Sequence, residues 1–250
     1  MKDRTVTAED EKPPDEPPAR RRSGYEILEL EMRSKILRTI TGKLESGASS
    51  AYTFHVLLEN GMQAVVKAAT TDGAAEAVRR EVASYEVAKL LGLTVVPPTV
   101  MRLHPSGDRL VKMSTQLYVH GVDHRADFSA VPEQEIRDAA AFELATCQID
   151  RQVRNWGVVH DADGDQLVFY DNTWSFDLMP PDLTLPELRG WRPGTPLSMI
   201  YVYAMMRLGG PNLELLQRLL EPDATRSLEP YLTVDEIDKM LGRVAKAAAA

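Results

Sequence analysis

The chain has 250 residues, of which 44% are hydrophobic and 26% are charged. These fractions are close to those of ordinary globular proteins, so they exclude a fibrous repeat and a wholly disordered chain. The formal net charge of -8 disfavours nonspecific binding to nucleic acid or to an anionic membrane. No stretch approaches the roughly 18 to 20 apolar residues of a membrane span, and the single cysteine, Cys147, excludes an intrachain disulfide framework. We therefore expect a soluble, cytoplasmic protein with one large domain or two small lobes.

The N-terminal part predicts a short tail followed by a sheet. Residues 1–22 combine proline pairs with charges of both signs and hold almost nothing to bury, so we expect a disordered tail. A short helix is expected from Tyr25 to Leu37. Strand patterns follow, and the Asn60-Gly61 pair is typical of a tight hairpin turn. The expected antiparallel meander covers 36–44, 51–59 and 63–69.

A helix is predicted after the third strand. Val78, Val82 and Tyr85 recur at helical spacing over 74–92, and Gly92 stands where a left-handed C-cap belongs. Two more strands are then expected. They cover 94–103 and 109–119, and the Pro97-Pro98 pair suits an edge strand.

From His120 onward the pattern becomes mostly helical. Pro132 starts a helix with one apolar face, formed by Ile136, Ala140, Leu144 and Cys147. A short hairpin over 156–160 and 166–170 interrupts the helices. The C-terminal part predicts three packed helices over 198–208, 213–220 and 233–244, the last opened by a capping box of Thr233 and Glu236.

Lys67 and Glu81 are the first candidate site residues. Glu81 lies one helical turn from Val78 and Tyr85, so it shares their inward face. A buried carboxylate needs a cationic partner, and Lys67 at the end of the third strand is the natural one. A lysine held in this way can bind nucleotide phosphates. Taken alone, the pair is more simply explained as a solvated lysine and a surface glutamate.

Asp150, Asn155 and Asp171 complete the candidate set. The D-x-x-x-x-N spacing of Asp150 and Asn155 lets one loop place a carboxylate at an attacking hydroxyl and an amide oxygen at Mg²⁺, with Arg151 or Arg154 to neutralise charge. Asp171 directly follows an apolar strand and supplies a hard oxygen ligand. Each is also a common turn residue, but the order Lys, Glu, Asp, Asn, Asp is much rarer than any one of them alone.

These stretches give the sequence a resemblance to a known family. VVK, REVASYEVAKLLGLTVVPPTV, STQLYV, DRQVRNWG and YDNTWSF resemble the atypical kinases related to phosphatidylinositol 3- and 4-kinases, in the group of HipA-like and bacterial phosphatidylinositol-kinase-like proteins. The similar segment runs from about Lys67 to Phe176. The chain departs from the family pattern where Gln152 replaces a frequent histidine and Thr173 stands near the usual position of a glycine.

The resemblance implies a role for each candidate. Lys67 contacts the nucleotide phosphates, Glu81 orients Lys67, Asp150 is the catalytic base beside Arg151, and Asn155 and Asp171 bind magnesium. The phosphate loop falls in the glycine-poor segment SGASS. The remaining nucleotide contacts are then expected from Ser49 and Ser50 in that loop and from the adenine hinge of Gln116, Leu117, Tyr118 and Val119.

Two other motifs suggest different chemistry. His120 and His124 have the spacing of a zinc site and could be joined by Asp123 or His160, which would make the protein a metal-dependent hydrolase. DADGDQ, from Asp161, resembles the start of a calcium loop but lacks the required glycine and glutamate, so we interpret it as a hairpin turn.

The sequence therefore predicts an α+β, compact bilobal protein-kinase-like fold. The expected parts are a disordered tail over 1–22, a sheet-rich N-lobe over 23–119 and a helical C-lobe over 120–250. The predicted enzyme is an ATP-dependent kinase using Mg²⁺ or Mn²⁺ that transfers the γ-phosphoryl group to a hydroxyl of a protein, lipid or small molecule. The alternatives are a nucleotide-binding pseudokinase acting through partners and the histidine and aspartate hydrolase.

Overall fold

The computed structural model describes residues 19–35, 37–44, 52–106, 108–124, 131–148, 150–151, 153–161, 164–176 and 199–249. Most of the expected tail, over 1–18, lies outside these residues, as do Ser49 and Ser50. The first helix, α1, spans Ala19–Ser34, so residues 19–22 belong to a helix and not to a disordered tail.

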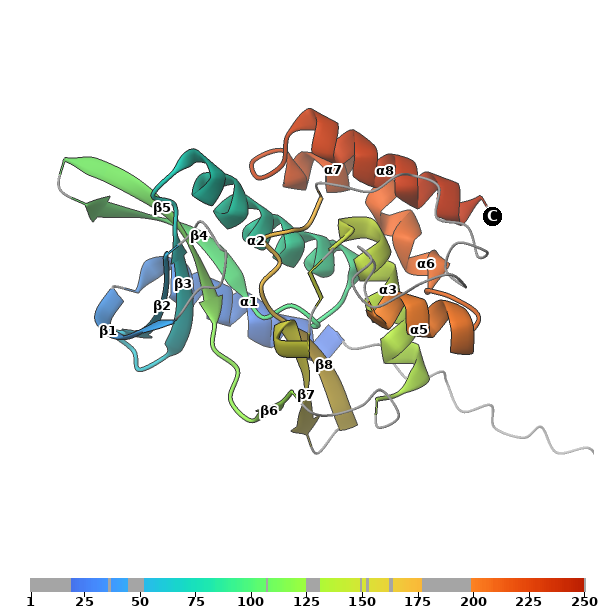
Figure 1. The fold of residues 1–250 in the computed structure, drawn as a ribbon, viewed down its shortest axis with the longest axis horizontal. Coiled ribbons are helices and arrows are strands. Elements are labelled where there is room, and N and C mark those ends of the chain that lie inside the picture. The colour runs from blue at the N-terminus through green and yellow to red at the C-terminus, as the bar shows by residue number, and fades with distance from the viewer. Residues whose placement is uncertain are drawn as a thin grey trace, which may run out of the picture.

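A five-stranded antiparallel sheet forms the N-terminal part (Figure 1). Its strand order is β1-β2-β3-β5-β4, so the expected meander is confirmed and β4 lies at an edge. The strands are β1 (Leu37–Leu44), β2 (Tyr52–Leu58), β3 (Gln63–Ala68), β4 (Thr99–Ser106) and β5 (Arg109–Leu117).

The helix α2, Asp72–Leu91, is inserted between β3 and β4 and has both of its ends encoded locally. The side chain of Thr71 caps its first turn by accepting a hydrogen bond from the Ala74 amide. Gly92 ends the helix with a φ of 90°, a left-handed conformation that glycine adopts without steric cost. The predicted helix and its C-cap are confirmed.

The rest of the chain combines a small sheet with helices. The β7–β8 hairpin pairs with the two-residue strand β6 in a three-stranded sheet, as expected for its two longer strands. The elements are β6 (Val122–Asp123), α3 (Glu133–Thr146), the 3-10 turn η2 (Val153–Asn155), β7 (Trp156–Asp161) and β8 (Gly164–Phe169).

The C-terminal helices differ in part from the sequence prediction. The helix expected over 213–220 is divided into α6 and a 3-10 turn, and α7 was not expected, although Pro222 at its first turn is a start signal. The capping box of Thr233 and Glu236 is present at the start of α8. These elements are α5 (Met199–Arg207), α6 (Leu213–Leu216), η3 (Gln217–Leu220), α7 (Pro222–Leu228) and α8 (Val234–Ala248).

Two hydrophobic clusters hold the molecule together. One packs Met32 of α1 against residues of the five-stranded sheet, including Val56, Val66 and Val100. The other joins the C-terminal helices to the β7–β8 hairpin and to the C-terminal half of α2. In Figure 1, α2 accordingly runs from the sheet toward the helical part. Within the residues described, no helix has the length and apolarity to cross a lipid bilayer.

This arrangement confirms the expected α+β class. It also brings the end of β3, the middle of α2 and the segment after β8 together with the loop after α3, because Lys67 contacts Glu81 and Asp171, and Gln148 contacts Asp171.

Candidate active site

Lys67 is the centre of the first charge network. It lies on β3 between Thr53 of β2 and Ser114 of β5 in the sheet register, and only 9% of the residue is exposed. Its Nζ donates hydrogen bonds to Oε1 of Glu81 on α2 and, at 2.7 Å, to Oδ1 of Asp171. Burial alone would lower the pKa of Lys67, but the charges of the two carboxylates raise it above its ordinary value. Lys67 is therefore held as a cation, as the sequence led us to expect.

Asp171 lies two residues after the end of β8 and adopts a φ of 50°, in the left-handed region. Its Oδ1 also accepts a hydrogen bond from Thr173 Oγ1 at 2.7 Å, and its backbone oxygen accepts one from Gln148 Nε2 at 2.7 Å. Burial would raise the pKa of this carboxyl group, but the charge of Lys67 and the hydrogen bonds of Lys67 and Thr173 lower it to about 2. The carboxylate is ionised at neutral pH and keeps 37% of its side chain exposed.

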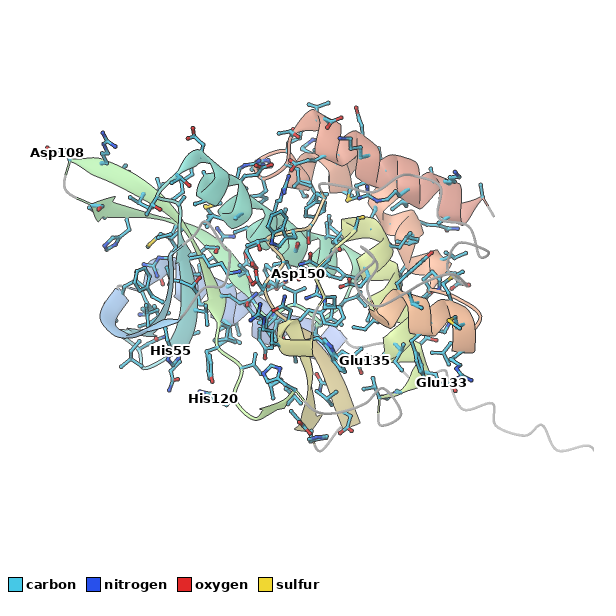
Figure 2. All side chains as sticks on the ribbon, in the orientation of Figure 1. His55, Asp108, His120, Glu133, Glu135 and Asp150 are labelled. Atoms are coloured by element: carbon cyan, nitrogen blue, oxygen red, sulfur yellow. The ribbon has the colours of Figure 1, made fainter. Side chains whose placement is uncertain are left out.

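Asp150 and Asn155 meet in the loop that follows α3. The Asn155 Nδ2 donates to the Asp150 backbone oxygen at 2.7 Å and to its Oδ2 at 3.3 Å. The Asp150 amide donates to Gln148 Oε1 at 3.1 Å, so Gln148 joins this loop to Asp171. Asp150 lies near the middle of the view in Figure 2, between the sheet and the C-terminal helices.

Arg151 differs from the expectation that it neutralises charge on a bound phosphate. Its side chain has no exposed surface and forms a buried ion pair with Glu143 of α3, with Nη2 to Oε1 at 2.8 Å. The guanidinium lies 4.3 Å from the centre of the Phe169 ring. Arg154, the other arginine considered for that task, is exposed. Arg151 is therefore placed to organise the protein rather than to contact a substrate.

The expected adenine hinge contains groups that the sheet already uses. The Leu117 amide donates to the Pro98 oxygen at 2.8 Å, and the Tyr118 amide donates to the Gln63 oxygen at 3.0 Å. The buried Gln116 side chain donates to Thr99 Oγ1 at 3.0 Å. These three groups are engaged within the protein, and nucleotide contact by the hinge residues stays a prediction.

A cluster of aromatic rings borders the same hinge. The ring of Tyr118 is 40% exposed and packs against His55 and His120 at centroid distances of 4.7 and 4.8 Å. In Figure 2, His55 and His120 lie together on the side of the sheet nearest the hinge. Val119 follows Tyr118 and is partly exposed. The Tyr118 ring and Val119 thus remain candidate nucleotide contacts.

The alternative metal site is not assembled. His124 Nδ1 lies 2.7 Å from the Trp156 backbone oxygen, and His160 Nδ1 lies 2.7 Å from Asp165 Oδ1. Among the residues that the structure describes, no group of three or more His, Cys, Asp and Glu side chains could hold a metal ion. The histidine and aspartate hydrolase is therefore not supported. The Asp161 to Gly164 pairing supports a hairpin turn at DADGDQ, of which residues 162–163 lie outside the described part.

Sequence reasoning missed three residues of the site: Glu143, Gln148 and Thr173. Their signal is weak because each is an ordinary polar residue, and only burial distinguishes them. Their exposed fractions are 3%, 2% and 6%. The position of Glu143 on the face of α3 opposite to solvent was detectable in principle, since the flanking residues 139–142 are apolar.

The donor set fits a magnesium nucleotide. Asp171 offers a carboxylate and Asn155 an amide oxygen, the hard ligands that Mg²⁺ prefers, and the amide nitrogen of Asn155 is already engaged by Asp150. Magnesium bound with phosphates needs only one or two protein carboxylates or similar oxygens. Lys67 adds a positive charge beside them.

Comparisons with solved structures bear on the fold of the chain. The crystal structure of the Golgi casein kinase matches with a TM-score of 0.54 and 14% sequence identity, covering 91% of this chain and 75% of that chain. The Helicobacter pylori proinflammatory kinase CtkA matches with a TM-score of 0.45 and 14% identity, covering 83% of this chain and 90% of that chain. No protein-family model and no curated protein sequence matches the chain. The first likeness shows that the chain has a kinase-like fold.

Proposed function

We propose that this protein is a kinase that uses ATP and Mg²⁺, or Mn²⁺, to phosphorylate a hydroxyl group of a protein, lipid or small molecule. The observation that carries the proposal is the contact of Lys67 with both Glu81 and Asp171, which lie 14 and 104 residues away in the sequence. A relationship to the phosphatidylinositol 3- and 4-kinases is part of the proposal and rests on the resemblance of the motifs.

Nucleotide binding would divide between residues that contact the phosphates, residues that hold the metal and residues that contact the nucleobase. Glu81 is only 2% exposed and keeps the Lys67 ammonium in place, so that Lys67 can bind the nucleotide phosphates. Asn155 and Asp171 would hold the magnesium ion, which supplies charge neutralisation on the phosphates. The exposed part of Tyr118, together with Val119, would contact the nucleobase; Ser49 and Ser50 remain proposed phosphate contacts.

Asp150 would act on the acceptor. Its carboxylate accepts the proton of the acceptor hydroxyl, while the hydroxyl oxygen forms a bond to the γ-phosphorus and the bond to the bridging oxygen of ADP breaks. Asn155 holds the Asp150 loop through two hydrogen bonds, which fixes the direction of the carboxylate. Catalysis would come from positioning and charge neutralisation, because phosphoryl transfer leaves little covalent chemistry to the protein.

The test combines a binding measurement with a transfer measurement. Mg-ADP should raise the thermal midpoint of the wild type, and EDTA should remove most of the shift, because a ligand bound only by the folded state stabilises it. Asp150→Asn should keep this shift and lower phosphoryl transfer from labelled ATP by roughly 100-fold or more, the scale of general-base catalysis. Absence of any nucleotide-dependent shift in the wild type would rule out the proposed function.

A pseudokinase is the second candidate. The observation that favours it is that Oδ1 of Asp171 already accepts hydrogen bonds from Lys67 and Thr173, so this oxygen is engaged within the protein. A pseudokinase would show the Mg-ADP shift with no transfer to any acceptor, and Asp150→Asn would leave its cellular activity unchanged.

A further inference from the structure

The buried ion pair of Glu143 and Arg151 has a second set of contacts beyond the pair itself. Oε1 of Glu143 accepts hydrogen bonds from Arg151 Nε at 3.0 Å and from Nη2 at 2.8 Å. Neither side chain has any exposed surface. Because desolvation offsets much of the attraction between buried charges, such a pair is weak evidence for stability. Its importance depends on what else the guanidinium holds.

The remaining donors of Arg151 bind the two loops that carry the proposed metal ligands. Nη1 donates to the backbone oxygens of Asn155 at 2.9 Å and Tyr170 at 2.8 Å, and Nη2 donates to Asn172 Oδ1 at 2.7 Å. With the two bonds to Glu143, these make five hydrogen bonds for the five N–H groups of a guanidinium. The bonds thus reach Asn155 itself and both neighbours of Asp171.

The two loops also contact each other at the same point. The Tyr170 amide donates to the Asn155 oxygen at 2.9 Å, so this oxygen accepts from both Tyr170 and Arg151. The Phe169 ring packs on one face of the planar guanidinium and so limits movement of Arg151 toward that side. Arg151 therefore adds its hydrogen bonds to a direct backbone contact between the two loops.

We propose that Glu143 and Arg151 are positioning residues, which set the separation of Asn155 and Asp171 before any ligand binds. Glu143 supplies the anion that keeps the guanidinium in place. Arginines beside a kinase site can instead order a segment by binding its phosphate, but here each N–H donor is already used within the protein. We call the Glu143–Arg151 pair with its hydrogen bonds to the two loops the brace; it forms within the protein without any ligand. The role assigned to it rests on the proposed function.

The test must separate positioning from stability. Substitution of one partner leaves an uncompensated buried charge and destabilises the whole fold, whereas replacement of both by apolar side chains is often neutral for stability. We therefore choose Glu143→Met combined with Arg151→Met. A second variant, Arg151→Lys, keeps the charge beside Glu143 but offers three donors in place of the planar set of five.

Two readouts are needed, one of them without ligand. The first is hydrogen exchange of the Tyr170 amide in the free protein, which should become faster in both variants because the loops are no longer held together. The second is Mn²⁺ affinity in the presence of ADP, followed by the electron paramagnetic resonance of Mn²⁺. Loss of residues that orient metal ligands typically weakens metal binding roughly 10- to 100-fold, and we expect that range here.

The matched control is another buried pair, Arg80 with Glu236, which joins α2 to α8 with Nε to Oε1 at 3.0 Å. The combined Arg80→Met and Glu236→Met variant also loses the cap of α8, so its thermal midpoint should fall. Its Mn²⁺ affinity and Tyr170 exchange should match the wild type. This control shows whether loss of stability alone produces the expected effects.

Each outcome decides between the possibilities. Faster Tyr170 exchange with weaker Mn²⁺ binding in the double Met variant supports the brace. Unchanged exchange, or unchanged Mn²⁺ affinity despite faster exchange, overturns it. If the wild type binds no Mn²⁺ with ADP, the proposed function fails, and the positioning role fails with it; the exchange data then decide only whether the pair couples the two loops.

Discussion

The two charge networks of the site differ in how completely the protein encloses them. Lys67 contacts Glu81, whose side chain is 3% exposed, and Asp171, whose side chain is 37% exposed. Arg151 and Glu143 have no exposed side-chain surface. The first network, which we call the open network, has one carboxylate that solvent reaches. The second, the closed network, has its donors satisfied within the protein and can only hold neighbouring groups in place.

The difference suggests how a site of this kind divides its charges. Under the proposed function, the Lys67 ammonium needs one carboxylate that stays bound to it and one that it can exchange for a phosphate. Glu81 is buried and suits the first role, whereas Asp171 is partly exposed and suits the second. A cation that orders loops needs every donor used, because an unsatisfied buried donor is costly. Both networks meet at the segment 170–172.

The largest expected effect is on the free energy of unfolding, which a substitution in the closed network should lower more than one in the open network. Glu143→Ala should lower the free energy of unfolding by about 3–5 kcal/mol, since it leaves the Arg151 charge buried and unpaired. Asp171→Ala should cost clearly less, because solvent reaches Asp171 and Glu81 continues to neutralise Lys67. Urea unfolding of both variants provides the measurement. Equal losses of unfolding free energy in the two variants would contradict this difference in burial between the networks.

A smaller effect is expected from coupling within the open network. Lys67→Ala and Glu81→Ala should weaken nucleotide binding by amounts that do not add, with a coupling of roughly 0.5–3 kcal/mol in a double-mutant cycle. The control is Glu86→Ala, because Glu86 is also a buried acid of α2 but pairs with Lys89 at 3.0 Å. Strictly additive losses, or a larger loss of nucleotide affinity at Glu86, would contradict the assigned role of Glu81.

The smallest expected effect is a pH dependence that belongs to Asp171. Its pKa is lowered from an ordinary value of 3.8 to about 2 in the folded protein, so the unfolded chain binds this proton more tightly. The stabilisation is therefore complete above about pH 4 and is lost as the pH falls toward about 2. Since the side chain is partly exposed, solvent screening limits the effect to the order of 1 kcal/mol.

The measurement compares wild type with Asp171→Asn. The difference in unfolding free energy between them should shrink as the pH is lowered from about 4 to about 2. A difference that stays constant over this range would show that Lys67 does not lower the pKa of Asp171.

Much of the fold was predictable because its signals are local. Gly92 ends α2 in a left-handed conformation, Thr233 and Glu236 cap α8, and the Asn60-Gly61 turn joins β2 to β3. The start of α1 at Ala19 was missed because charged and proline-rich flanks resemble disorder, and the break after α6 was missed because 213–220 has one continuous apolar pattern.

The sequence by itself determined the class of fold, the order of its longer elements and the inward position of Glu81, since these follow from periodicity and caps within short segments. Only the tertiary structure decided that Asp171 meets Lys67 across 104 residues, and that Arg151 is buried against Glu143 instead of being available to neutralise charge on a phosphate. The physical reason is that a charged side chain binds the partner that packing brings within reach. That partner is set by how α3, β8 and the sheet share their cores, and neither residue type nor spacing specifies it.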